Sequence, residues 1–534
     1  MAQGYFKDDM EIVGQVYFDN LAMRSFFQHL KNDCFDETRL ICKMHDIVQD
    51  FAQFLTKNEC LIIETNDIEV PKIKSVHERT RHLMIFGEKN SPFPVSVYKL
   101  KKLRSLLLRF PSHEFESGEL LLDLFGQLTC LRSLDLSRPI FGVSSIHRLP
   151  NEVGQLIHLR LLDLSWNTEL TKLPESLCHL YNLQTLNIRW CLDLKELPHG
   201  MGKLINLRHF DNLGTASLTF MPKCLGRLTS LRTFERLVVG GISNDGEAMT
   251  LGDLRQLNNL RGTLYIRGLG SVKDVQEATN AQLLNKKHLL KLMLRFDGQI
   301  TDTDRIDDLL LEALQPPLDL EILYIDEYMV LAIWPSWLIQ LTRLRELRLE
   351  SFKNIEQLPP LGILPALQVL YIKNMPKVNK VGLEFLGIGT PPFSSSSPAF
   401  PQLQVLRFDD MANWEEWDYE ITTGTVHHST SNTNTSTFMV MPLLKSLRFF
   451  ACHKLKDQEK IRQDLVKAST TSLLMDLLSA TVTTIDSQWE EEQDFNDMNQ
   501  RILKLTKTRR HLKSFKRAYD ERIQSEKERW ITQN

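Results

Sequence analysis

A short leucine pattern, Leu-x-x-Leu-x-x-Leu-x-Leu, recurs along this chain at a fixed distance. From Leu156 it begins again at Leu180, Leu204 and Leu228, each time 24 residues later. A fixed period of this length means that one structural unit is repeated, and each unit can bury its leucines only against its neighbours. The 534 residues also exceed what one compact core accommodates. We therefore expect an open-ended array of stacked units.

A second marker has the same period, in prolines that are 24 residues apart: Pro150, Pro174, Pro198 and Pro222. Proline cannot donate to a sheet ladder, so we expect it where each unit leaves its strand and turns along the outer side. The Leu-x-Leu alternation marks the strand, with Leu134 and Leu136 pointing inward. The period lies in the range of roughly 20 to 29 residues that leucine-rich repeats show. The expected fold is α/β, a leucine-rich-repeat horseshoe (a solenoid with a parallel concave sheet).

The outward strand positions, and residues just past the strands, would form the concave face. Stacked parallel strands place such side chains on one polar and aromatic surface, which suits the recognition of another macromolecule. The predicted partner-binding residues are Asp135, Asp163, Trp166, Asn187, Arg189, Trp190, Arg348, Tyr371, Lys373, Arg407 and Asp409.

The array becomes irregular after Leu237. Residues 240–320 keep strand-like pieces, at Leu264–Ile266, Leu292–Leu294 and Leu323–Ile325, but insert longer connections. One of these, Val275 to Leu290, is expected to be helical. Two polar inserts further on, Ser394 to Ser397 and Thr422 to Thr437, are interpreted as loops.

Composition and charge exclude several classes of protein. The formal net charge is -3, so no global field favours nucleic acid or an anionic membrane. The sequence has neither a secretory signal pattern nor a run of about 18 apolar residues that could span a membrane. Its eight scattered cysteines fit reduced thiols. We expect a cytoplasmic protein, with the nucleus as the alternative, and we assign no catalytic residues and no metal ligands.

The segment before the repeats has a different pattern. Residues 17–27 predict a short helix, residues 32–38 a polar hairpin, and the apolar residues between Ile47 and Leu55 a helix with one packed face. Two helices and a hairpin in about 60 residues would form only a marginal core. This segment is therefore interpreted as part of a larger domain.

Several motifs make the chain resemble one family. Those at the N-terminus are Met1 to Tyr5, Tyr17 to Gln28 and Lys43-Met44-His45-Asp46, and those in the repeats are Arg79 to Leu83, Leu260 to Ile266, Trp334 to Trp337 and Leu358 to Gly362. Together they resemble plant coiled-coil nucleotide-binding leucine-rich-repeat disease resistance proteins. The resemblance implies a partial winged-helix end of a nucleotide-binding switch domain at 1–75 and a leucine-rich-repeat domain at 76–456. Residues 457–534 depart from the family and are predicted to be a helical, charged tail.

The resemblance also implies a function in plant defence. The repeats would sense a pathogen effector or a guarded host protein and fold back on a nucleotide-binding domain, supplied in cis or in trans. In the family, the Met-His-Asp histidine lies against the phosphate of bound ADP, so His45 and Asp46 inherit a nucleotide contact by position. The chain contains no Gly-x-x-x-x-Gly-Lys-Ser/Thr phosphate loop. We therefore expect no cofactor for this chain by itself. ADP or ATP would bind only if a complete nucleotide-binding domain were supplied. We also expect the sequence to begin partway through the switch domain.

Alternative interpretations stand beside these. Asp46 is a favoured helix N-cap, and this role competes with nucleotide contact. The basic run from Arg501 to Lys516 could be a nuclear-localisation or nucleic-acid patch, although such runs are usually solvated faces, and nucleic acid is not the expected partner. A free-standing adaptor, such as a substrate-recognition subunit of a ubiquitin ligase, is the second function considered. An enzyme is the third, and no nucleophile, metal or phosphate motif favours it.

Overall fold

The computed structural model describes residues 10–33, 36–56, 59–65, 79–87, 93–109, 118–138, 146–240, 248–297, 307–328, 334–388, 398–418 and 440–467. The chain divides into two units, one made of Met1–Phe26 and Met44–Ser472 and the other of Phe27–Lys43 and Leu473–Asn534. The described part of the second unit is a two-stranded sheet of β1 (Phe27–Asp33) and β2 (Asp36–Met44). These strands flank the segment expected to be a hairpin.

The first unit begins its repeat sheet with eight parallel strands, each paired with the next in chain order: β3 (Cys60–Thr65), β4 (His82–Gly87), β5 (Ser105–Arg109), β6 (Ser133–Asp135), β7 (Leu161–Asp163), β8 (Thr185–Asn187), β9 (His209–Asp211) and β10 (Thr233–Phe234). Equivalent residues of successive repeats pair directly, as Asp135 does with Asp163. The leucine period therefore sets the strand register, and β3 lies within the first 75 residues.

A second sheet follows with eight more parallel strands: β11 (Arg236–Val238), β12 (Arg261–Arg267), β13 (His288–Arg295), β14 (Ile322–Asp326), β15 (Glu346–Glu350), β16 (Val369–Lys373), β18 (Val405–Asp409) and β20 (Ser446–Phe450). The first sheet ends at Phe234 and the second begins at Arg236. There the side-chain amide of Asn212 makes hydrogen bonds that a neighbouring strand's backbone would otherwise make. Its Nδ2 donates to the Arg236 carbonyl at 2.7 Å, and its Oδ1 accepts from the Arg236 N–H at 3.0 Å. Two short strands, β17 (Lys380–Val381) and β19 (Glu416–Trp417), pair with each other in a separate two-stranded sheet. In sequence, β17 follows β16 and β19 follows β18.

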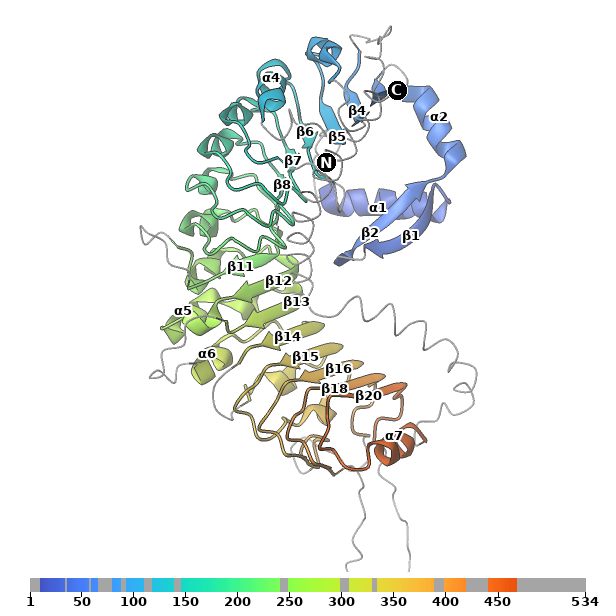
Figure 1. Ribbon diagram of the computed structural model, residues 1–534, viewed down its shortest axis with the longest axis vertical. Coiled ribbons are helices and arrows are strands. Elements are labelled where there is room, and N and C mark those ends of the chain that lie inside the picture. The colour runs from blue at the N-terminus through green and yellow to red at the C-terminus, as the bar shows by residue number, and fades with distance from the viewer. Residues whose placement is uncertain are drawn as a thin grey trace, which may run out of the picture. The chain divides into compact units, whose positions relative to one another are not determined.

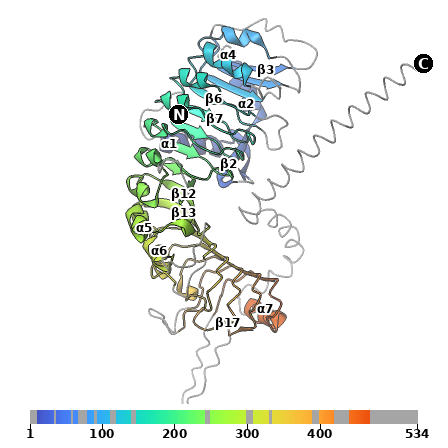
Figure 2. The ribbon, with the colours of Figure 1, turned by 60° about the vertical axis from the view of Figure 1, so that its left-hand side comes forward.

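Short helices form the other side of most described repeats, so strands line one side of the stack and helices the other (Figures 1 and 2). Three of the in-phase prolines, Pro150, Pro174 and Pro222, are the N-cap residues of 3-10 helices. The helical elements are η1 (Val95–Lys99), α4 (Glu119–Gln127), η2 (Asn151–Gln155), η3 (Glu175–His179), η4 (Met201–Lys203), η5 (Lys223–Arg227), η6 (Leu251–Gln256), η7 (Leu269–Ser271), α5 (Val275–Ala281), η8 (Leu283–Asn285), α6 (Asp307–Ala313), η9 (Leu338–Gln340) and η10 (Leu361–Ile363).

One hydrophobic core runs through the stack from Ile63 to Leu465. The inward residues Leu134 and Leu136 are 1% and 0% exposed, as the alternation predicts. In the irregular region, β12, β13 and β14 contain the three predicted strand pieces. The expected helix from Val275 to Leu290 is wrong at its end, because helical structure stops at Asn285 and β13 begins at His288. The cause is an alternation of period two, in which Leu289 is buried and Leu290 exposed.

Most described repeats turn away from their strand through a left-handed residue, two positions after the second inward strand residue. This position has a positive φ in Trp166, Trp190, Gly214, Gly268, Glu327, Ser351, Asn374, Asp410 and Ala451. Glycine adopts this conformation at no steric cost, whereas other residues pay a penalty. The left-handed turn therefore recurs with very different side chains.

Near the N-terminus, α2 (Asp46–Thr56) contains the helix expected at 47–55, whereas α1 (Met10–Met23) stands where a helix was expected at 17–27. The first prediction placed the helix too late, and Phe26 and Phe27 lie outside it. After the last repeat strand, α7 (Gln458–Lys467) buries Ile461 and Leu465. Both polar inserts, the basic run from Arg501 to Lys516 and the rest of the predicted tail lie outside the described residues.

Candidate protein-recognition surface

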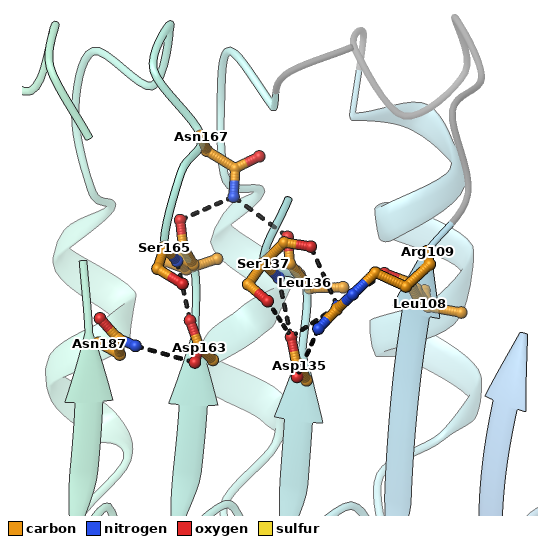
Figure 3. Close-up of polar contacts among 10 residues, drawn as sticks. Leu108, Arg109, Asp135, Leu136, Ser137, Asp163, Ser165, Asn167 and Asn187 are labelled. Carbon is orange, nitrogen blue, oxygen red and sulfur yellow. Dashed lines mark hydrogen bonds and ion pairs between the residues drawn. The ribbon is translucent and has the colours of Figure 1, made fainter. Parts of the chain in front are cut away.

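The outward residues of the first sheet form a hydrogen-bonded network at the ends of neighbouring strands (Figure 3). Arg109, at the end of β5, holds the Asp135 carboxylate with both terminal nitrogens, at 2.9 and 3.1 Å. The backbone N–H and the hydroxyl of Ser137 donate to the same carboxylate at 2.9 and 2.7 Å. Asp135 is therefore fixed in place by an ion pair and a local turn.

Asp163 continues this network on β7. It accepts from the Ser165 N–H at 2.9 Å and from Nδ2 of Asn187 at 2.9 Å (Figure 3). Burial, reinforced by the neighbouring Asp135 charge, raises the pKa of the Asp163 carboxyl above its usual range, although its hydrogen bonds oppose the shift. The carboxylates of neighbouring repeats are thus close enough to repel one another.

Two of the predicted partner-binding residues, Arg189 and Asn187, are more buried than their outward direction suggests. Arg189 has a side chain only 3% exposed, 3.5 Å from Asp211 and 3.7 Å from Glu235. Asn187 is 5% exposed, and its Oδ1 accepts from the Arg189 N–H at 3.0 Å. Alternation gives the direction of these side chains correctly, but neighbouring repeats cover them.

The two predicted tryptophans stack on each other, with ring centroids 5.3 Å apart and planes inclined by 23°. Trp166 is partly exposed, but Trp190 is fully buried. The expectation that Trp190 stands on the recognition surface is therefore wrong. Both residues occupy the left-handed turn position, with φ of 65° and 59°. The alternation of inward and outward side chains, which holds within the strand, therefore does not predict where these two side chains point.

The outward residues of the second sheet pair in register across the strands. The middle position runs from Tyr324 through Arg348, Tyr371 and Arg407 to Arg448, one residue per strand. The Arg348 guanidinium lies 4.5 Å from the centre of the Tyr324 ring, and that of Arg407 lies 5.3 Å from the Tyr371 ring. We call these five residues the Tyr/Arg row.

Carboxylates beside the Tyr/Arg row hold its side chains. Glu346 accepts from Nε of Arg348 at 2.7 Å, and Asp409 accepts from Nε of Arg407 at 2.9 Å. The Tyr371 hydroxyl also donates to Asp409 at 2.9 Å. Burial and the Asp409 charge raise the pKa of Tyr371, so its hydroxyl keeps its proton.

Two further predicted residues differ in exposure. Lys373 lies 2.6 Å from Glu350 and keeps 29% of its side chain exposed. Asp409 is 3% exposed and so acts from beneath the Tyr/Arg row.

Several members of this surface lie outside the set of residues predicted from the sequence. Tyr324 lies outward in the Leu323–Ile325 piece, and its hydroxyl donates to Glu346 at 2.7 Å. Arg295 lies 2.5 Å from Glu327 and 3.6 Å from Asp326. The signal that could have found them is the Leu-x-Leu alternation itself, applied to the irregular strands as strictly as to the regular ones.

At the junction of the sheets, Arg236 is an arginine that no outward position predicts. It is 2% exposed, and its Nη1 donates to the Thr215 carbonyl at 2.7 Å. Burial, with a contribution from Arg267, lowers the pKa of Arg236 to about 10. Arg236 is therefore an internal hydrogen-bond donor of the stack and not part of the exposed surface.

His45 and Asp46 begin helix α2. The ring Nδ1 of His45 accepts from the Ile47 N–H at 3.2 Å, and its carbonyl accepts the first helical bond, from the Gln49 N–H at 2.8 Å. His45 is therefore the N-cap, and the expectation that Asp46 fills this role is wrong by one residue, since Asp46 is already within the helix. The aromatic nitrogen does here what an Asp or Asn side chain usually does.

The apolar side of α2 is open in the described structure. Ile47, Phe51, Phe54 and Leu55 are 73%, 61%, 67% and 65% exposed. Four large apolar side chains at helical spacing are costly to leave in water, and such patches mark interaction sites. The expectation of a packed face is not met within the described residues.

The described residues offer little support for a metal site, a disulfide or a membrane span. Within the described ranges, no group of three His, Cys, Asp or Glu side chains is arranged to hold a metal ion. All cysteines in these ranges are free thiols. Among the helices described, none is long and apolar enough to cross a bilayer.

Two family models match parts of the chain. The disease resistance protein winged helix domain matches residues 1–52, and the R13L1/DRL21 leucine-rich repeats match residues 251–375. The second match covers the irregular strands β12 to β16. The expected winged-helix segment and repeats are both confirmed.

Curated relatives extend the match over most of the chain. RPP13-like protein 1 of Arabidopsis thaliana, named as a disease resistance protein, is 37% identical over 79% of this chain and 40% of its own length. The similarly named At3g14460 of the same plant is 35% identical over 76% of this chain and 28% of its own. RGA1 of Solanum bulbocastanum is 36% identical over 69% and 33%. The chain spans less than half the length of each relative, and both its N-terminal segment and its leucine-rich repeats are similar to those of plant disease resistance proteins.

Proposed function

We propose that this chain is the recognition portion of an intracellular plant immune receptor, acting in the cytoplasm or nucleus. Its strand face would bind a pathogen effector or a guarded host protein. The observation that carries the proposal is the in-register Tyr/Arg row, because tyrosine and arginine are enriched among the residues that dominate protein interfaces. Asp135, Asp163, Trp166 and Lys373 would contribute around it.

We further propose that α2 docks on a nucleotide-binding switch domain. Its exposed side chains Ile47, Phe51 and Leu55 form an apolar face suited to a partner, and the winged-helix match suggests what kind of domain supplies it. The His45 ring is engaged with the backbone of its own helix, which supports a structural role in this chain. ADP or ATP would then bind only together with a complete nucleotide-binding domain.

The proposed mechanism is binding and not catalysis. The carboxylates of the strand face are held by arginines, hydroxyls and backbone N–H groups, as Asp135 is by Arg109 and Ser137. Such groups are oriented to present a fixed surface, which lowers the entropy cost of association. Recognition would change how the repeats engage the switch domain, and so relieve its inhibition.

The test is a binary binding screen against secreted pathogen proteins, host proteins and a nucleotide-binding switch domain supplied in trans. A protein that binds the wild type should bind Tyr371→Ala/Arg407→Ala at least tenfold more weakly, the loss expected from about 1.4 kcal/mol. Tyr181→Ala is the matched control, since Tyr181 is 52% exposed and follows η3 on the helical side. If neither any candidate nor the supplied domain bound, the proposal would fail.

A further inference from the structure

The middle outward position changes its chemistry between the two sheets. In strands β6 to β9 of the first sheet it carries Asp135, Asp163, Asn187 and Asp211 in register, and from β14 to β20 of the second sheet it becomes the Tyr/Arg row. We propose that the Tyr/Arg row binds an acidic segment of a protein partner, with carboxylates on its arginines and apolar groups on its tyrosines. This inference rests on the proposed function and names the partner's chemistry.

The row is a continuous strip and not a set of separate side chains. Arg348 pairs in register with Tyr324 on one side and Tyr371 on the other, and Arg407 pairs with Tyr371 and Arg448. Neighbouring strands are roughly 4.8 Å apart, so the guanidinium groups of Arg348 and Arg407 each lie within contact distance of a ring. The Lys291 ammonium adds a further cation, 4.6 Å from the centre of the Tyr324 ring.

The neighbouring carboxylates orient the arginines before any partner arrives. Glu346 accepts from Nε of Arg348, and Asp409 accepts from Nε and Nη2 of Arg407, at 2.9 and 2.8 Å. One carboxylate cannot accept from all five N–H donors of a guanidinium. Side chains fixed in this way lose little entropy on binding, and their planar forks suit a partner's carboxylate. Arg348 keeps 31% and Arg407 16% of the side chain exposed.

Charge also decides between a protein and a nucleic acid as the occupant. A phosphate backbone is uniformly negative, and it would meet Glu346 and Glu350 beside the row and the aspartates of the first sheet beyond it. A protein segment can carry carboxylates over Arg348 and Arg407 and basic groups over Asp135 and Asp163. The reversal of charge along the face therefore favours a protein whose own charge reverses in the opposite sense.

The experiment uses the full chain as bait for a display library of random peptides, followed by affinity measurements on the enriched sequences. The test variant is Arg348→Gln/Arg407→Gln, and Arg348→Lys is a milder second variant that keeps the charge. Arg343→Gln is the matched control, because Arg343 is also ion-paired, to Asp319 at 3.1 Å, but is 69% exposed and precedes β15. An oligothymidylate is measured in parallel, and thermal unfolding verifies that each variant is folded.

We expect peptides rich in Asp and Glu that bind the double variant about tenfold or more weakly and the Arg343→Gln control unchanged. Peptides that need Arg348 and Arg407 but are not acidic would overturn this inference and leave recognition by the strand face standing. No enrichment, or peptides unaffected by the double variant, would count against both proposals. Binding of the oligothymidylate that is lost in the double variant would replace the protein segment by a nucleic acid.

Discussion

The indole of Trp190 lies against Gly214, the residue that occupies the same turn position 24 residues later. Both have a left-handed backbone, with φ of 59° and 75°. A Cβ atom on Gly214 would overlap Cε3 of the indole and lie 2.6 Å from Cδ2. One repeat thus uses the turn position for a large ring, and the next must leave it empty of side chain.

Replacing Gly214 by alanine should therefore destabilise the stack. We expect the free energy of unfolding to fall by about 2 to 4 kcal/mol, because left-handed alanine costs about 1 to 2 kcal/mol and the overlap forces Trp190 to move. Urea unfolding followed by circular dichroism measures the change. In a Trp190→Ala background the same substitution should cost less, since only the backbone penalty remains.

Gly126 provides the matched control for this substitution. It lies in α4, and a Cβ there would meet nothing within 4 Å. Gly126→Ala should stabilise by roughly 0.5 to 1 kcal/mol, the usual difference in helix propensity. Equal effects at Gly214 and Gly126 would contradict the steric account.

The N-cap at His45 leads to a second prediction. His45→Ala removes the acceptor for the Ile47 N–H and should destabilise the start of α2 by about 1 kcal/mol, whereas His45→Asn supplies a favoured capping side chain and should preserve it. Hydrogen exchange of the amides at the start of α2 reports this directly. If Asn accelerated exchange as much as Ala, the ring nitrogen would not be the cap.

The sequence predicts the repeated part of this fold well because leucine spacing is a local property. A side chain that alternates into the core, such as Leu136, must be buried whichever repeats surround it. The outer surface is less predictable. Arg189 points outward along β8, but its burial depends on Asp211 and Glu235, which come from later repeats. Periodicity gives the direction of a side chain and not what covers it.

Trp190 shows a second limit. Its position follows the strand, where alternation no longer applies, and the turn is left-handed. Glycines at equivalent positions, Gly214 and Gly268, are the signal that could have shown this. Read together, they indicate a backbone turn into which a tryptophan has been fitted.

Asp163 should make the stability of the first sheet depend on pH in an unusual direction. Burial and Asp135 raise the pKa of its carboxyl in the folded chain above the unfolded value. The folded state then binds a proton more readily, so the penalty of the buried charge is relieved as pH falls through the raised pKa. Relative to Asp163→Asn, which cannot titrate, the wild type should gain stability between neutral pH and about pH 4. Urea unfolding at several pH values measures both proteins, and a wild type that lost stability relative to Asp163→Asn as pH fell would contradict the expected sign.

Lys286 supports the last prediction, because it is fully buried and its Nζ donates to the Leu254 carbonyl at 2.8 Å and to Oδ1 of Asn258 at 3.3 Å. Lys286→Met should lower the free energy of unfolding by about 1 to 3 kcal/mol, since buried acceptors at the end of η6 lose their donor. Burial lowers the pKa of Lys286 to about 8.

The unfolded chain therefore holds this proton more firmly between about pH 8 and 10.5, and the wild type should gain stability over Lys286→Met as pH rises through that window. The exposed neighbour Lys287, changed to Met, should shift the free energy of unfolding by less than about 0.5 kcal/mol at any of these pH values. Denaturant unfolding of the three proteins at neutral and alkaline pH makes the comparison. A loss in Lys286→Met no larger than in Lys287→Met would mean that the buried ammonium does not hold the end of η6.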